Sequence, residues 1–202
     1  MGMQSVSHLS IVPVVYNCYL DFCLLGHHYM ATRWLEFQRL FSRQIGFSPS
    51  SVDYTGLYIM QNVEALRQLT EIERLLGSVR SIAVVGLSPK ENRPSNMVGR
   101  YLLDVGYTVY PVNPGQTIIL GQTCYADLLS IPFPIDIVDI FRNSEDVLPI
   151  VEQAVSLSRR PRAIWMQQGV INETAAELAL NSGIFVVMDR CIKIDHQNLI
   201  RK

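Results

Sequence analysis

The sequence lacks the signatures of several common protein classes. Its 202 residues carry a formal net charge of −1, and no basic stripe marks a nucleic-acid-binding protein. The four cysteines show neither zinc-ligand spacing nor a Cys-x-x-Cys pair, and no secretory signal is recognisable. We therefore expect reduced thiols, a cytoplasmic location and no nucleic-acid or membrane partner.

The chain divides near residue 60 into two parts of different character. Residues 60–202 alternate strand and helix patterns, whereas residues 1–59 form an irregular extension with one possible short helix at 31–45. The apolar stretch 9–25 is interrupted by polar residues and proline, which argues against a membrane span. We expect the extension to lie outside the core, or to result from an upstream start codon, because Met60 directly precedes the first patterned helix.

The second part is typical of an α/β fold. Apolar runs alternate with amphipathic helices, which indicates a parallel sheet covered on both faces. We predict a Rossmann-like, doubly wound sheet of six parallel strands in the order 3-2-1-4-5-6, the third being a short edge strand. The expected strands are 81–85, 107–112, pieces of 118–125, 135–140, 163–166 and 184–188, and the main helices are 63–76, 95–105, 143–157 and 172–182.

The first strand ends in a segment that resembles a nucleotide-binding turn without its usual glycines. Gly86 ends the strand, Leu87–Ser95 follows, and we expect Ser95 to cap the next helix. A strand, a turn and a helix N-terminus can cradle a phosphate, although G-x-G-x-x-G is absent. The second strand ends in Asn113 and Pro114, where an NAD site would carry an acid for the ribose. The pattern therefore favours a different adenine nucleotide.

Polar and basic residues follow the other strands at the same sheet edge. Lys90, Arg93 and Arg142 could offset phosphate charge, and the alternative is that Lys90 and Arg93 are solvated loop charges. Cys191 follows the last strand, close to Arg190 and Lys193, but no base accompanies it and a structural thiol is the simpler interpretation.

Three aspartates and three large apolar residues complete the candidates for chemistry. We assign Asp136 and Asp139 to capping or loop anchoring, because their odd spacing places them on opposite faces of a strand. We expect Asp189 to pair with Arg190 or with a backbone amide. The residues expected in the core are Trp165, Met166 and Met188.

Five segments resemble the small bacterial CoA-binding-domain proteins. They are I-A-V-V-G-L-S-P-K-E-N-R-P-S (82–95), P-V-N-P (111–114), V-D-I-F-R (138–142), I-W-M-Q-Q-G-V (164–170) and V-M-D-R-C-I-K (187–193). The resemblance implies a domain similar to the CoA-binding domain of the succinyl-CoA synthetase alpha subunit. The synthetase's phosphohistidine domain has no counterpart here, so ligase activity is not implied.

The implied ligand is CoA or acyl-CoA, held at the first turn and after the second and fourth strands. We expect a stand-alone CoA-binding module without evident catalytic residues. The alternatives are a thiol-dependent enzyme that uses CoA with Cys191, and an NADP-binding regulator. The expected cofactor-binding residues are Gly86, Leu87, Ser88, Lys90, Arg93, Pro94, Ser95, Asn113, Pro114, Phe141, Arg142 and Asn143.

Overall fold

The computed structural model describes residues 54–201. Helix α2 (Tyr54–Ser78) includes the helix expected at 63–76 and begins before residue 60, so the expected boundary falls inside a helix. The extension's possible helix at 31–45 lies outside the described residues. The independence of residues 1–59 from the core stays a prediction.

A five-stranded parallel sheet forms the centre of the unit that begins at Glu73. Its strands are β1 (Ser81–Val85), β2 (Thr108–Val112), β5 (Ile137–Ile140), β6 (Ala163–Met166) and β7 (Phe185–Val187), in the order β2-β1-β5-β6-β7. All four pairings are parallel, with Val84 opposite both Pro111 and Asp139. The predicted Rossmann-like class and this strand order are confirmed.

The sheet edge beyond β2 is shorter than the sequence suggests. The expected third strand is reduced to one parallel bridge, between Val112 and Tyr125. Strands β3 (Ile118–Ile119) and β4 (Gln122–Thr123) instead pair antiparallel with each other. Leu120 and Gly121 between them both have positive φ, of 53° and 74°, as a type I′ hairpin requires. The local turn chemistry therefore takes these residues out of the main sheet.

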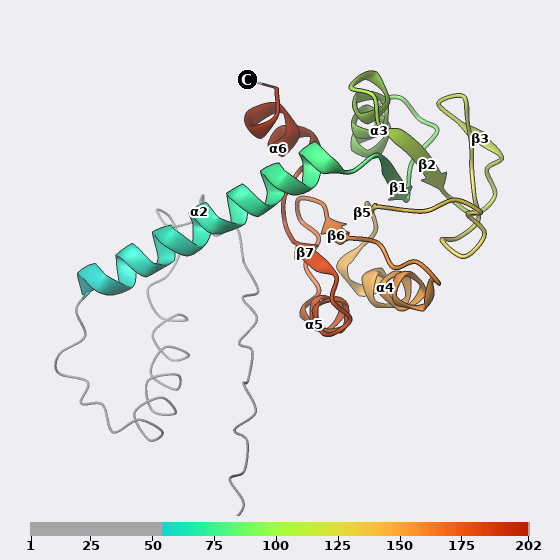
Figure 1. Ribbon diagram of the computed structural model, residues 1–202. Helices are drawn as coiled ribbons and strands as arrows, with labels where there is room; N and C mark the ends of the chain where they lie inside the picture. The colour runs from blue at the N-terminus through green and yellow to red at the C-terminus, as the bar shows by residue number, and fades with distance from the viewer. Residues whose placement is uncertain (1–53, 202) are drawn as a thin grey trace, which may run out of the picture. The chain divides into compact units, whose positions relative to one another are not determined.

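Helices cover both faces of the sheet (Figure 1). Helices α4 (Val147–Ser156) and α5 (Glu173–Asn181) lie on one face, and α3 (Pro94–Asp104) and α6 (Ile192–Leu199) lie on the other. Alternate residues of each strand serve the two faces, so Ala83 and Val85 join the α4–α5 core while Ile82 and Val84 point the other way. Trp165, Met166 and Met188 are buried, which confirms the prediction that they belong to the core.

Candidate functional site

Gly86 sets the geometry of the first turn at the carboxyl edge of the sheet. Its φ is +85°, and a Cβ atom placed on it would lie 2.6 Å from the carbonyl oxygen of Phe141. Its N–H donates to the carbonyl of Val112 at 2.8 Å. Glycine is therefore required here for both its conformation and its small size, and it draws the ends of β1, β2 and β5 together.

Helix α3 begins one residue earlier than the sequence suggests, and Ser95 is not its cap. Pro94 occupies the first helical position, which suits its fixed φ and missing N–H, and Arg93 is the N-cap without a side-chain bond. The buried Ser95 hydroxyl instead accepts a hydrogen bond from the N–H of Ser88 at 3.1 Å. Ser95 thus fixes the shape of the turn.

The turn is held by further bonds that leave its basic residues exposed. The Ser88 carbonyl accepts from the side chain of buried Asn96 at 2.8 Å, and the Ser88 hydroxyl accepts from the N–H of Lys90 at 3.2 Å. The residues Lys90 and Arg93 are both exposed. Asn96 and Met97 donate their N–H groups to the Arg93 carbonyl. The turn therefore combines a fixed backbone with free positive charge.

Asn113 joins the end of β2 to this turn. Its side-chain amide donates to the carbonyl of Leu87 at 2.8 Å, and its backbone N–H donates to the carbonyl of Tyr125 at 2.9 Å. Leu87 is fully buried, so it serves as a core anchor for the turn, whereas Pro114 is exposed. The structure thus brings the two predicted segments, 86–95 and 113–114, into direct contact.

The third predicted segment lies at the end of β5. The N–H of Phe141 donates to the carbonyl of Val85 at 2.8 Å, and Arg142 and Asn143 are exposed. A 3.7 Å ion pair joins Arg142 to Asp146, with both side chains about half exposed. Because such pairs are weak in water, Arg142 can exchange Asp146 for an anionic ligand.

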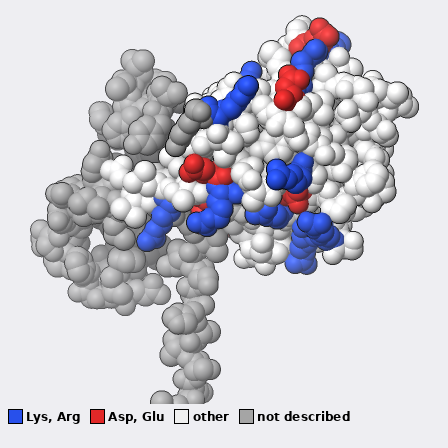
Figure 2. Space-filling view, turned by 45° about the horizontal axis from the view of Figure 1, so that its top comes forward, with Lys and Arg blue, Asp and Glu red and all other residues white. Residues whose placement is uncertain are grey.

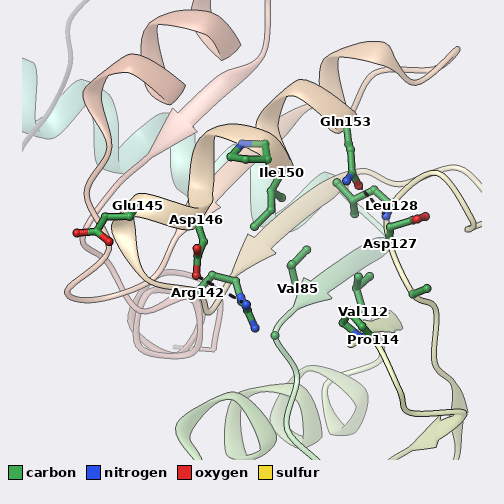
Figure 3. Close-up of a pocket in the computed structure, with 13 residues that line it drawn as sticks. Val85, Val112, Pro114, Asp127, Leu128, Arg142, Glu145, Asp146, Ile150 and Gln153 are labelled. Atoms are coloured by element: carbon green, nitrogen blue, oxygen red, sulfur yellow. Dashed lines mark hydrogen bonds and ion pairs between the residues drawn. The ribbon is translucent and has the colours of Figure 1, made fainter.

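A cleft of about 300 Å³ opens between the ends of these strands and α4 (Figure 3). Val85, Val112 and Leu128 supply apolar surface, and Arg142 reaches into the space between α4 and β1. Asp127, Glu145 and Asp146 also border the cleft, but the carboxylates of Asp127 and Glu145 point away from it, and Asp146 is paired with Arg142 (Figure 3). The remaining lining residues are Gly86, Pro114, Ala126, Pro149, Ile150 and Gln153. The apolar lining suits a flat, uncharged group, and Arg142 adds a positive charge beside it.

Sequence reasoning missed two parts of this site. One is the wall from α4 and residues 126–128, where the side-chain oxygen of Gln153 accepts from the Leu128 N–H at 3.2 Å. The other is Gly99 in α3, where an added Cβ would lie 2.7 Å from Leu87 Cδ1. Gly99 lets the helix approach the turn, as the third glycine of G-x-G-x-x-G does. A glycine inside an amphipathic helix was the available signal.

The prediction that Asp136 and Asp139 both serve in capping or loop anchoring is wrong for Asp139. Asp136 does anchor a loop, because its carboxylate accepts from the N–H groups of Arg80 and Ser81. Asp139 instead lies fully buried in β5; Oδ1 accepts from Gln167 at 2.8 Å, and Oδ2 has no partner. Burial raises the pKa of Asp139 to about 7, against a smaller lowering by the Gln167 bond. The odd spacing of Asp136 and Asp139 predicted that they lie on opposite faces of the strand, but it did not predict that Asp139 is fully buried.

The C-terminal segment holds its charged groups in internal pairs. Asp189, at a φ of +53°, accepts from the N–H of Gly169 at 2.7 Å, as predicted. Arg190 forms a two-bond ion pair with buried Asp195, and the Lys193 ammonium lies 5.6 Å from the centre of the Tyr101 ring. Both cations that lie near Cys191 in the sequence thus have other partners. The half-buried thiol stands at the N-cap of α6 without a capping bond.

Two further classes of feature are missing from residues 54–201. No group of three or more His, Cys, Asp or Glu side chains there is arranged to hold a metal ion. Among the helices of the same range, none combines the length and apolarity needed to cross a bilayer.

Known proteins share this architecture and much of its sequence. A family model described as a CoA binding domain matches residues 80–197. The uncharacterized protein YneT of Bacillus subtilis (strain 168) is 40% identical over 126 residues, which make up 62% of this chain and 92% of YneT. The ADP-forming acetate–CoA ligase I of Archaeoglobus fulgidus is 29% identical over 119 residues, 55% of this chain but 17% of the ligase. A hypothetical protein of Pyrococcus horikoshii OT3 superposes with a TM-score of 0.63 at 37% identity, covering 65% of this chain and 92% of that protein.

Proposed function

This chain belongs to the CoA-binding domain family, and on that premise we propose that it binds coenzyme A or an acyl-CoA at the carboxyl edge of its sheet. The observation that carries the proposal is that three segments, 86–95, 113–114 and 141–143, meet at one edge of the sheet. Asn113 donates to the Leu87 carbonyl, and the Phe141 carbonyl lies directly against Gly86. Ligands of open parallel sheets bind at this edge, where the strand order reverses.

The charges of the site suggest which part of the nucleotide the turn would bind and which part the cleft would bind. Lys90 and Arg93 on the turn would meet phosphates, Arg93 by paired hydrogen bonds and Lys90 as a point charge. The cleft beside α4 would take the adenine ring, because Val85, Val112 and Leu128 supply apolar surface there and adenine is flat and uncharged. Arg142, beside this apolar surface, would exchange Asp146 for a phosphate of the same ligand.

NADP is the competing ligand from the same chemical class. Asn113 stands where an NAD site carries its acid, and its amide nitrogen is already bonded to Leu87. Asp127 at the border of the cleft is nevertheless a carboxylate that a ribose hydroxyl could approach. The family membership favours CoA. The proposed role is that of a binding module, with no catalytic residue assigned.

Arginine substitutions test where the ligand lies. Arg93→Ala and Arg142→Ala should each weaken CoA binding, measured by isothermal titration calorimetry, by roughly 1.5–3 kcal/mol, the usual contribution of a hydrogen bond to a charged group. Arg162→Ala is the matched control, because Arg162 is exposed and lies before β6, at the opposite edge of the sheet. Unchanged affinity in both site variants would place the ligand elsewhere.

A further inference from the structure

Four arginines gather at the amino edge of the sheet, opposite the proposed CoA site. Arg80 precedes β1, and Arg159, Arg160 and Arg162 lie in the connection from α4 to β6. All four are exposed. We call these residues the amino-edge arginines. Figure 2 shows one face of the molecule, on which Lys and Arg side chains lie in groups with Asp and Glu side chains beside them.

Asp136 contacts three of these four arginines. Its Oδ2 accepts from the backbone N–H of Arg80, its carbonyl accepts from the N–H of Arg162 at 2.8 Å, and its Oδ1 pairs with Arg159 at 3.4 Å. The backbones of Arg80 and Arg162 therefore flank Asp136, roughly 10 Å apart, because neighbouring strands are about 4.8 Å apart. The cluster is thus fixed by the register of β1, β5 and β6.

The Asp136 carboxylate does not neutralise the charge of the amino-edge arginines. The cluster carries four guanidinium groups and one carboxylate, and of the four only Arg159 pairs with that carboxylate among the described residues. Burial would raise the pKa of Asp136, but hydrogen bonds from Arg80 and Ser81 and the charge of Arg159 hold it below its usual range. Arg160 is held by the carbonyls of Val155 and Ser182, so its charge is fixed in position. Among residues 54–201, no hydrogen bond or ion pair reaches the guanidinium groups of Arg80 and Arg162. The edge therefore presents positive charge to solvent, and the Arg80 and Arg162 side chains have no partner in that range to give up.

We propose that the amino-edge arginines dock an acidic segment of a partner protein. Guanidinium groups recognise carboxylates by paired hydrogen bonds, and the backbones that carry Arg80 and Arg162 are held in place by Asp136. The patch spans only three strands, and the chain as a whole is slightly negative. A long polyanion such as nucleic acid would meet unfavourable charge beyond the patch, whereas a short run of Asp or Glu would not. The docking surface and the CoA site occupy opposite edges, so both can be filled together.

Fluorescence anisotropy with a short labelled oligoglutamate peptide tests this surface on the full chain. We expect binding that weakens with added salt and that falls about tenfold in the double variant Arg80→Gln/Arg162→Gln. These side chains are exposed and their backbone bonds remain, so folding should be retained, which a thermal melt checks. Arg100→Gln/Arg201→Gln is the matched control with the same loss of charge, and it should bind the peptide as the unmodified chain does.

The other outcomes overturn the proposal. Equal loss in the patch and control variants would show only general charge attraction. An oligothymidylate of matched charge that binds more tightly than the peptide, and loses affinity in the patch variant, would assign the surface to nucleic acid instead. CoA affinity should not change in the patch variant, so a failure here leaves the proposed CoA site standing.

Discussion

Gly86 and Gly99 determine how closely the first turn of the site can approach its neighbours. At Gly86 the neighbour is a backbone carbonyl, which cannot move without displacing β5. At Gly99 the neighbour is the side chain of Leu87, which can rotate. The two glycines therefore differ in how much substitution they tolerate, although both lie beside the proposed ligand.

Gly86→Ala should destabilise the fold by roughly 2–4 kcal/mol and abolish CoA binding. The substitution adds a backbone clash to the cost of about 1–2 kcal/mol for a side chain at positive φ. Gly183→Ala is the matched control, since its φ is +77° and no atom lies within 4 Å of an added Cβ. Urea denaturation should show the smaller cost alone for Gly183→Ala, and equal costs would contradict the clash.

Asp139 should make the stability of the domain depend on pH. Its folded pKa is about 7, whereas an unfolded Asp titrates near 3.9. Between those values the unfolded chain loses its proton and the folded chain keeps it. The free energy of unfolding should therefore fall as pH rises from about 4 to 7, and then level off.

Asp139→Asn should remove this dependence. Asparagine has the shape of the aspartate and can accept the Gln167 bond, but it carries no charge. The difference in unfolding free energy between variant and parent should therefore shift in favour of the variant, by on the order of 3 kcal/mol, between pH 4 and pH 8. Chemical denaturation of both proteins across this range gives the comparison. Parallel pH profiles would show that the Asp139 carboxylate is ionised in the folded state.

At the scale of elements, α6 is tied to α3 by a buried polar contact. The Tyr101 hydroxyl lies 2.8 Å from Nδ1 of His196, and the Tyr107 ring meets the same imidazole edge-on. Burial lowers the pKa of His196, and the nearby Arg201 lowers it further. A neutral imidazole thus holds the last helix in place.

Tyr101→Phe should lower the free energy of unfolding by roughly 1–3 kcal/mol, because it leaves a buried ring nitrogen without a partner. Tyr110→Phe is the matched control, as that ring stacks on Phe133 and the structure gives its hydroxyl no hydrogen bond. Guanidinium denaturation followed by circular dichroism measures both. A loss in Tyr110→Phe as large as in Tyr101→Phe would contradict the role of the His196 contact.

Individual elements were predictable where one local signal dominated. The run Ser81–Val85, predicted as a strand, is buried throughout and forms β1. The helix predicted at 172–182 forms as α5, with Asn172 as its N-cap. The prediction that Ser95 caps α3 is wrong because the helix already begins at Pro94. The predicted edge strand does not form because the Leu120–Gly121 turn pairs the residues on either side of it with each other. Competing local signals therefore account for both errors.

At the scale of the whole molecule, the sequence predicted which strand ends meet but not which helix completes the cleft. The place of residues after strands predicted that they share one sheet edge, because carboxyl ends of parallel strands meet there. The resemblance to the CoA-binding-domain proteins then singled out segments 86–95, 113–114 and 141–143 among them. The contribution of α4 and of Asp127 depends on packing between distant elements. The burial of Asp139 has the same origin, since it requires helices on both faces of β5.

The central claim is that the carboxyl edge binds coenzyme A, and calorimetric titration of the full chain with CoA, NAD and NADP tests it most directly. We expect CoA to bind with one site per chain and at least about tenfold more tightly than either dinucleotide, a difference of about 1.4 kcal/mol. The missing acid at the end of β2 and the basic turn both favour this order. NAD or NADP binding as tight as CoA, or no heat with CoA, would contradict it.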